Sequence, residues 1–294
     1  MAKPMSRRGS WIRVPVFLAG LSFFGFSQSI NPPYPWLSRE EIIAPIQERI
    51  APPPGYRRTM VEPGSFAQWL RRLPLKPAGS PVRLFNGTLK ANQAAHHAVI
   101  ALDTGPRNLQ QCADAVIRLR AEYLFSNGRS SEICFHFTCG DVFPFARWAQ
   151  GERPVVRNNR VTWKHRATAD RSYSSLRRYL TTLFIYAGSH SLQREMTPRP
   201  LNQIRSGDVF VEGGFPGHAV LVVDLARHAQ SGELVFLLAQ SYMPAQEMHV
   251  LKNPDDAKLS PWYRLPESDT LVTPEWTFHA DSLRAFATAE KSAD

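Results

Sequence analysis

Cysteine is scarce in this chain. There are three cysteines in 294 residues, at Cys112, Cys134 and Cys139, whereas small exported proteins built on disulfides carry many more per residue. Three thiols cannot all pair, so at least one stays free. A strand over residues 133–138 would point Cys134 and Cys139 to opposite faces when it continues, which disfavours a bridge between them. The composition therefore excludes a disulfide scaffold and leaves a thiol to be explained.

Long apolar runs are also lacking beyond the amino terminus. At the amino terminus itself, residues 14–26 are mostly apolar, and four basic residues precede them. Ser27 and Ser29 then place small side chains where a signal peptidase cleaves. We therefore expect a signal peptide over residues 1–29 and an exported bacterial protein, either periplasmic or extracellular. The alternative is that residues 1–29 stay uncleaved as an anchor, and the protein would then contact the membrane through this segment alone.

Acidic residues are fewer than basic ones, and the formal net charge is +10. The expected signal peptide holds four basic and no acidic residues, which leaves +6 (10 minus 4) for residues 30–294. This excess favours anionic surroundings such as cell-wall polymers or lipid headgroups. Arg71-Arg72, Arg129 and Arg177-Arg178 are scattered without aromatic residues between them, so we expect no nucleic-acid partner.

Several signatures of known sites are missing. There is no internal repeat, and Ser241 does not lie in a Gly-x-Ser-x-Gly turn, which excludes a serine hydrolase of that type. No histidine pair has helical i, i+4 spacing with a carboxylate nearby, so we expect neither a metal nor another cofactor. The histidines considered for a metal are His96, His97, His136 and His249.

Proline sets the organisation of the chain. Residues 30–63 are rich in proline, and we expect a tether followed by a surface loop there. Ser65 is expected to cap a short helix that Pro74 ends. Residues 64–290 are long enough to bury a substantial core and are expected to form one globular domain.

Hydrophobic patterns and turn signals predict an α+β fold. The expected helices cover residues 66–72, 109–125, 143–150 and 173–187, the last capped by Asp170. The expected strands cover residues 82–85, 97–102, 132–137, 161–164, 209–212, 218–224 and 234–240. Short turns join the last strands, so we expect a mostly antiparallel sheet.

The second expected helix carries one of the cysteines. Asn108 and Gln111 match a capping box, which places Cys112 in the first turn. Apolar residues recur at helical spacing and predict that Cys112 faces inward, namely Leu109, Cys112, Val116, Leu119 and Tyr123. An ion-pair ladder is expected on the opposite side, from Asp114, Arg118 and Glu122.

Three residue types that thiol hydrolysis needs occur in a suggestive order. Cys112 heads a helix, His218 opens an apolar strand, and Gln240 closes the strand expected beside it. The start of one strand lies beside the end of its antiparallel neighbour, so His218 and Gln240 are expected to meet. A cysteine nucleophile, an imidazole base and an amide that orients the ring are the parts of such a site.

The helix start favours reactivity of this cysteine. Its partial positive charge and unpaired N–H groups lower a thiol pKa and stabilise a developing oxyanion. Gln111 or Gln110, just before Cys112, is expected to supply a further donor to that oxyanion.

Each of these residues also has a purely structural explanation. A cysteine on a helix stripe is commonly a small core residue, and a buried glutamine is commonly satisfied by the backbone. Asp224 is an alternative orienting group. It lies on the His218 strand, but six residues along a strand span about 20 Å, which is too far to touch the ring.

The three segments resemble those of papain-like thiol peptidases. His218-Ala219-Val220 and Gln240-Ser241-Tyr242 are similar to the His motif and the Asn-Ser-Trp run of that group. The chain also resembles NlpC-type cell-wall peptidases and amidases, in which Gly-Asp precedes the His strand as Gly207-Asp208 does here. The resemblance implies a papain-like core with the nucleophile helix packed on the sheet. The chain departs from both patterns, because Cys112 lacks the usual Gly, Ser or Trp neighbours and Gln240 replaces Asn or His.

Over residues 54–286 the chain resembles an uncharacterised bacterial family, domain of unknown function 4846. The resemblance rests on residues 109–115, 118–124, 216–220 and 239–246. It implies no assigned reaction.

We therefore expect an exported cysteine hydrolase that acts on an amide bond in a peptide or peptidoglycan-like substrate, and that is a monomer. The alternative is a non-catalytic envelope module that binds glycan or peptide in the same groove. Its binding surfaces would be aromatic, namely Trp148, Trp163, Trp262 and Tyr242. A Cys112 sulfur within about 4 Å of a His218 ring nitrogen favours the enzyme, because proton transfer needs near hydrogen-bond contact.

Overall fold

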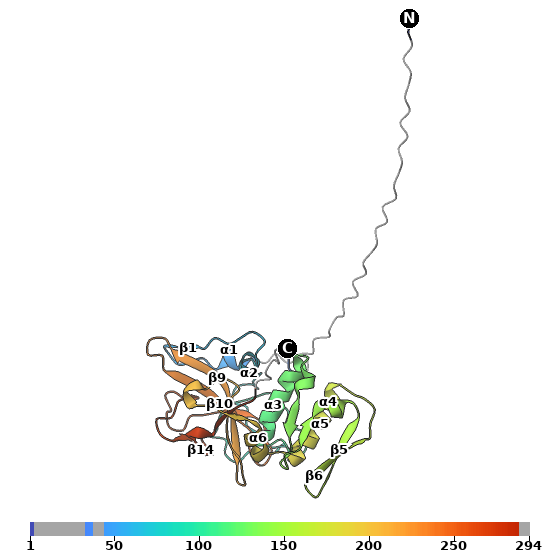
Figure 1. Ribbon diagram of the computed structural model, residues 1–294. Helices are drawn as coiled ribbons and strands as arrows, with labels where there is room; N and C mark the ends of the chain where they lie inside the picture. Colours follow the sequence, from blue (N-terminus) through green and yellow to red (C-terminus); the bar gives the residue numbers. More distant parts are fainter. Residues whose placement is uncertain (3–32, 38–43, 288–294) are drawn as a thin grey trace.

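The computed structural model describes residues 1–2, 33–37 and 44–287 (Figure 1). Apart from its first two residues, the expected signal peptide over residues 1–29 lies outside this part. Within the described ranges, no helix is both long and apolar enough to span a bilayer.

A nine-stranded sheet organises the molecule, and its strands pair in antiparallel fashion. Its main path runs β2, β11, β10, β9, β8, β15, β7, while β1 pairs with β9 and β12 pairs with β10. In chain order these strands are β1 (Tyr56–Arg58), β2 (His96–Val99), β7 (Thr197–Pro198), β8 (Val209–Glu212), β9 (His218–His228), β10 (Leu234–Gln240), β11 (His249–Leu251), β12 (Trp262–Arg264) and β15 (Leu283–Ala285). The prediction of a mixed α and β protein with a mostly antiparallel sheet is confirmed.

Both faces of the sheet are covered, which explains why residues 219–223 of β9 are all apolar rather than alternating with polar residues. Ala219, Leu221 and Val223 join the larger core cluster with the helices. Val220 and Val222 join a second cluster on the other face. That face is covered in part by the hairpin of β13 (Thr270–Val272) and β14 (Thr277–His279).

Helix α3 (Cys112–Ser126) lies at the centre of the molecule, between the sheet and a second group of elements (Figure 1). The second group contains β3 (Cys134–His136), β4 (Val142–Pro144), α4 (Phe145–Ala149), β5 (Glu152–Arg157), β6 (Arg160–His165), α5 (Tyr173–Tyr186) and α6 (Ser189–Glu195). Three short 3₁₀ turns complete the described part, η1 (Ser130–Glu132), η2 (Leu201–Gln203) and η3 (Ala280–Ser282).

The amino-terminal part of the globular body begins earlier than the sequence predicts. Residues 46–58, assigned above to the tether and loop, form α1 (Ile46–Arg49) and β1. Ile46 and Ile50 are buried in the main core, and β1 pairs with the far end of β9. The sequence favoured a loop here because prolines interrupt residues 46–58 and the apolar residues between them are few and widely spaced.

Helix starts are only partly as predicted. Ser65 caps α2 (Phe66–Arg71) by accepting a hydrogen bond from the Gln68 N–H. The cap of α3 is Gln111, not Asn108, and Asp114 accepts from the Gln111 N–H at 3.0 Å. Ser172, not Asp170, caps α5. The strand expected over residues 82–85 is replaced by isolated bridges.

The predicted ion-pair ladder on α3 is confirmed for Arg118 and Glu122, but Asp114 forms no ion pair among the described residues, and this side of the helix is buried. Arg118 and Glu122 are both 0% exposed and pair with each other, with 3.3 Å between Nε and Oε1. Arg118 also contacts Asp103 and Gln110. The second group of elements covers this face, and helical periodicity alone gives no sign of that cover.

Candidate functional site

A cleft of about 500 Å³ opens at the start of α3. It is lined by Cys112, His218 and Gln111, three of the four predicted site residues. The fourth, Gln240, lies behind His218 and is fully buried. The other lining residues are Asn108, Leu109, Ala113, Asp114, Phe184, Ala187, Gly188, Ser189, Gly214, Phe215, Pro216, Gly217, Tyr242, Met243 and Trp276.

Cys112 is the first residue of α3 and is half-buried in the cleft. Burial, and to a smaller extent the Asp114 carboxylate, raises the pKa of its thiol to about 11. The backbone N–H groups of Ala113 and Ala219 oppose the shift, because they stabilise a thiolate. Burial outweighs the helix start here, so the thiol is protonated at neutral pH.

His218 and Gln240 meet as predicted. The His218 Nε2 atom lies 2.8 Å from Gln240 Oε1, and both side chains are buried. An amide oxygen only accepts, so Nε2 carries the ring proton and Nδ1 keeps its lone pair. Burial, together with the nearby Lys90 charge, lowers the pKa of His218 to about 4 although the Gln240 hydrogen bond opposes the shift, so the ring is neutral at pH 7.

No hydrogen bond joins Cys112 to the His218 ring among the described residues, and Nδ1 has no partner there. Side-chain alternation along β9 explains this. His218 stacks on Phe278 at 5.7 Å, on the face that β13 and β14 cover. The first turn of α3 packs on the other face, next to Ala219. The two side chains therefore share a cleft only where the sheet ends.

The two glutamines before Cys112 have different surroundings. Gln110 is buried, donates to the Asp103 carbonyl and accepts from Arg118, so its expected role at an oxyanion is wrong. Gln111 lines the cleft, and its Nε2 donates one hydrogen to Asn108 Oδ1 at 3.3 Å. The second hydrogen of that amide remains available to a ligand.

Aromatic side chains enclose His218. Tyr242 meets the ring edge-on at 4.6 Å, and Trp276 lies 5.5 Å away. Trp276 is fixed by a 3.1 Å hydrogen bond from Nε1 to Glu212 Oε2. Of these two aromatic residues, the sequence predicted only Tyr242 as a binding surface.

Two large apolar residues stand exposed at the cleft. Phe215 is 95% exposed and Met243 is 55% exposed. Both lie on loops that adjoin the site, since one precedes β9 and the other follows β10. Most other large apolar side chains of the described ranges are buried, so the cleft is one of the few places where apolar side chains are exposed.

Gln240 has polar neighbours that the sequence did not reveal. Its Nε2 donates to Glu275 Oε2 at 2.7 Å and lies 3.5 Å from His249 Nε2. Lys90 forms an ion pair with Glu275 and is itself buried. His249 is paired with Gln240 in the strand register of β10 and β11, which explains its position.

The remaining candidates lie outside this cleft. Asp224, the alternative orienting acid, is buried and pairs with Arg58 and Arg71 at 2.6 and 2.7 Å. Trp148, Trp163 and Trp262 do not line the cleft. All three cysteines are free. Within residues 1–2, 33–37 and 44–287, no three His, Cys, Asp or Glu side chains come together as metal ligands would.

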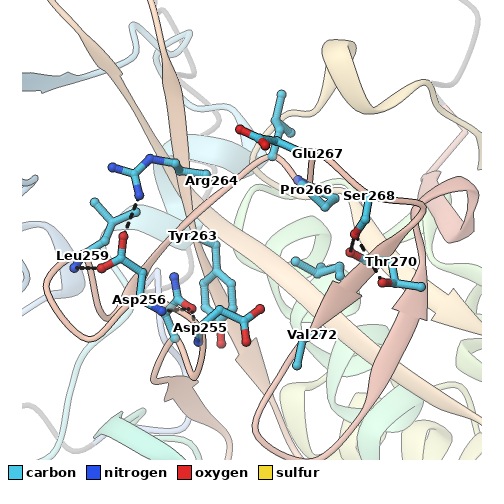
Figure 2. Close-up of a pocket in the computed structure, with 13 residues that line it drawn as sticks. Asp255, Asp256, Leu259, Tyr263, Arg264, Pro266, Glu267, Ser268, Thr270 and Val272 are labelled. Atoms are coloured by element: carbon cyan, nitrogen blue, oxygen red, sulfur yellow. Dashed lines mark hydrogen bonds and ion pairs between the residues drawn. The ribbon is translucent and has the colours of Figure 1, made fainter.

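A second pocket, of about 520 Å³, has different chemistry (Figure 2). Tyr263 and the ion pair between Asp256 and Arg264 lie at one side of it, and Glu267 and Ser268 lie at the other. Its 13 lining residues include no cysteine and no histidine. It therefore offers no nucleophile and base pair of the kind found at α3.

Comparison with known proteins gives a single result. A family model described as "Domain of unknown function (4846)" matches residues 46–285. No curated protein and no solved structure matches the chain.

Proposed function

We propose that this chain, which belongs to the family described as domain of unknown function 4846, is a cysteine hydrolase that cleaves amide bonds at the α3 cleft. The observation that carries the proposal is the 2.8 Å contact between His218 Nε2 and Gln240 Oε1. It leaves the Nδ1 lone pair free in a histidine that shares its cleft with a first-turn cysteine. The nucleophile would be Cys112, the base His218 and the orienting amide Gln240.

The reaction begins from a neutral pair. Because the pKa of Cys112 is raised to about 11 and that of His218 is lowered to about 4, no thiolate and imidazolium pair exists in the empty cleft. Sγ attacks the carbonyl carbon of the substrate while its proton passes to His218 Nδ1, directly or through one water. Substrate must bring these groups closer than they are in the empty cleft, and catalytic contacts commonly tighten in this way.

The later steps use the same residues. The backbone N–H of Cys112 and the free hydrogen of Gln111 Nε2 would stabilise the oxyanion. The C–N bond then breaks, and the leaving amine takes the proton from His218. Water attacks the resulting thioester with His218 again as base, which releases the acid and restores the thiol.

We propose further that α3 and the sheet form a papain-like core. Support comes from the nucleophile helix packed against β9 and from the histidine and amide on adjacent antiparallel strands. A peptide or peptidoglycan-like substrate and an exported location are part of the same proposal. They are supported by the amino-terminal sequence and by the positive charge of residues 30–294.

The test uses a variant with Cys134→Ser and Cys139→Ser, which leaves Cys112 as the sole cysteine. Both replaced residues are exposed, so the fold should be preserved. The variant is treated with a dipeptide vinyl sulfone and the adduct is located by mass spectrometry. We expect modification of Cys112, slowed roughly 100-fold by His218→Ala, because general-base catalysis contributes factors of that order. An adduct that forms equally fast without His218 would overturn the proposal.

A second candidate is a binding module without catalysis. It is favoured by the lack of a hydrogen bond between Cys112 and His218 and by the exposed Phe215 and Met243 at the cleft. In that case cell-wall glycan or peptide fragments would change the fluorescence of Trp276 equally in wild type and in Cys112→Ser. No fragment would be hydrolysed by the wild type.

A further inference from the structure

The amide of Gln240 has two orientations that differ only in which end faces His218. If its oxygen faces the ring, Nε2 of His218 carries the proton and Nδ1 is a base. If its NH₂ group faces the ring, Nε2 must accept, Nδ1 carries the proton, and the ring cannot take a proton from Cys112. The oxygen and nitrogen of an amide are nearly the same size, so the surrounding hydrogen bonds decide between the two.

Glu275 is the first group that decides. Its Oε2 lies 2.7 Å from Gln240 Nε2. The same carboxylate is paired with the buried Lys90, and Asn92 Nδ2 lies 3.3 Å from the other oxygen. A carboxylate held by these donors accepts hydrogen bonds and does not donate them. The NH₂ group of Gln240 must therefore face Glu275.

His249 agrees with this orientation. Its Nδ1 lies 2.9 Å from the Glu247 carbonyl oxygen, which can only accept, so Nδ1 carries the proton. Nε2 of His249 is then an acceptor, and it lies 3.4 Å from Lys90 Nζ and 3.5 Å from Gln240 Nε2. Burial of His249 keeps this ring neutral by lowering its pKa to about 3. Both acceptors near the Gln240 nitrogen therefore favour the same orientation.

We infer that Glu275 is a positioning residue: held by Lys90, it fixes the Gln240 amide and so sets His218 in the tautomer with hydrogen on Nε2. The Gln240 oxygen that results is the partner at 2.8 Å from the ring. The inference rests on the proposed function only for the use of that tautomer, because the tautomer itself follows from the hydrogen bonds.

The position of Glu275 in the chain supports this role. It precedes Trp276, which packs on His218 and lines the cleft. The turn between β13 and β14 thus contacts both the ring and the amide that holds it. Because Trp276 is anchored to Glu212 at the end of β8, the turn is fixed to the strand beside β9.

The direct test is the tautomer of His218, read from ¹⁵N-detected histidine NMR of the whole chain and assigned by its loss in His218→Asn. Wild type should show hydrogen on Nε2. Glu275→Leu keeps the side-chain volume and removes the acceptor, so a mixture of tautomers is expected. Glu275→Gln restores an accepting oxygen and should restore the wild-type signal. Glu233→Ala, which removes a surface partner of Arg264, is the matched control and should change nothing.

A second readout follows the base itself. In the sole-cysteine variant, Glu275→Leu should slow iodoacetamide alkylation of Cys112 about tenfold, less than the loss of roughly 10⁴ known for a fully wrong tautomer, because His249 still accepts from Gln240. If Glu275→Leu does not fold, the double variant Lys90→Met with Glu275→Leu is used instead, because it leaves no buried charge unpaired.

Two outcomes would overturn the inference. One is a wild-type His218 with hydrogen on Nδ1. The other is an unchanged His218 signal in folded Glu275→Leu or in the folded double variant Lys90→Met with Glu275→Leu. If the tautomer shifts as expected while Cys112 never forms the vinyl sulfone adduct, the proposed hydrolase is wrong and the role of Glu275 stands.

Discussion

Ser241 Oγ lies 3.2 Å from the carbonyl oxygen of Gln110 and 2.8 Å from that of Gln246. Ser241 directly follows β10, and Gln110 lies two residues before Cys112, so this side chain links the end of β10 to the start of α3. The position of the thiol relative to Gln240 and His218 is therefore set by a contact between the sheet and the start of α3, not by α3 alone.

Ser241→Ala is expected to disturb the site more than the fold. It removes a buried hydroxyl contact and should lower the free energy of unfolding by about 1–2 kcal/mol, measured by urea denaturation. Alkylation of Cys112 should slow as well, because the helix start is no longer held. Ser126→Ala removes another buried serine contact, to Tyr123 O at the far end of α3. It should cost similar stability and leave alkylation unchanged. Equal alkylation in both variants would contradict the coupling.

Stability should fall in mild acid because His249 is buried in its neutral form. Its pKa is lowered from 6.5 to about 3 by burial and by Lys90. Between these values the unfolded chain binds a proton that the folded chain does not, so stability decreases as the pH falls through this window. From pH 7 to 5 the loss is on the order of 2 kcal/mol for this histidine.

His249→Asn should reduce that pH-dependent loss by about the same amount. Urea denaturation at pH 7 and pH 5 gives the comparison, and only the difference between the two pH values is used. His279→Asn, at an exposed position of β14, is the control and should keep the wild-type difference. A His249 variant with the full wild-type loss would show that its ring is not held neutral.

Arg118→Ala should be among the most destabilising single changes in the chain. It leaves Glu122 buried without its nearest charge partner and removes the contact to Gln110, for an expected cost of about 3–5 kcal/mol. Arg129→Ala breaks a pair of the same kind with Glu132 at the surface and should cost less than about 1 kcal/mol. Similar costs for the two variants would mean that the interior pair is hydrated.

Phe215→Ala tests the apolar side of the cleft. The ring is 95% exposed, so the free energy of unfolding should change by no more than about 0.5 kcal/mol. In the sole-cysteine variant (Cys134→Ser, Cys139→Ser), N-benzyl iodoacetamide should alkylate Cys112 faster than iodoacetamide does. Phe215→Ala should lower that preference about fivefold, the effect of losing one aromatic contact. Met60 is 97% exposed and lies away from the cleft, so Met60→Ala should keep the preference.

Much of the strand arrangement could be predicted from the sequence. Val209–Glu212 and Leu234–Gln240 are strands with the predicted bounds, and β9 begins at His218 as predicted. The meeting of His218 and Gln240 followed from antiparallel geometry, which fixes neighbours from the positions of strand ends alone. The residues at the start of α3 were also placed correctly in one cleft with His218.

The sequence could not show which faces of a helix or strand are covered, or which other elements cover them. Arg118 and Glu122 have the spacing of an exposed ladder, but the cover comes from α5, about 50 residues later, where Tyr173 donates to Glu122. Glu275 reaches Gln240 through a turn between two short strands far along the chain. The direction of His218 relative to Cys112 depends on the strand face, which a one-residue change of register would reverse.

The position of Glu275 has a consequence for the order in which the protein becomes competent. Translation proceeds from the amino terminus, so Cys112, His218 and Gln240 are made before Glu275, which follows Gln240 by 35 residues (275 minus 240). A nascent chain that already contains Cys112, His218 and Gln240 still lacks the Glu275 carboxylate, which by our inference sets the tautomer of His218. During translation the site of the nascent chain therefore stays incomplete until the turn between β13 and β14 has been synthesised and packs next to Gln240 at the end of β10.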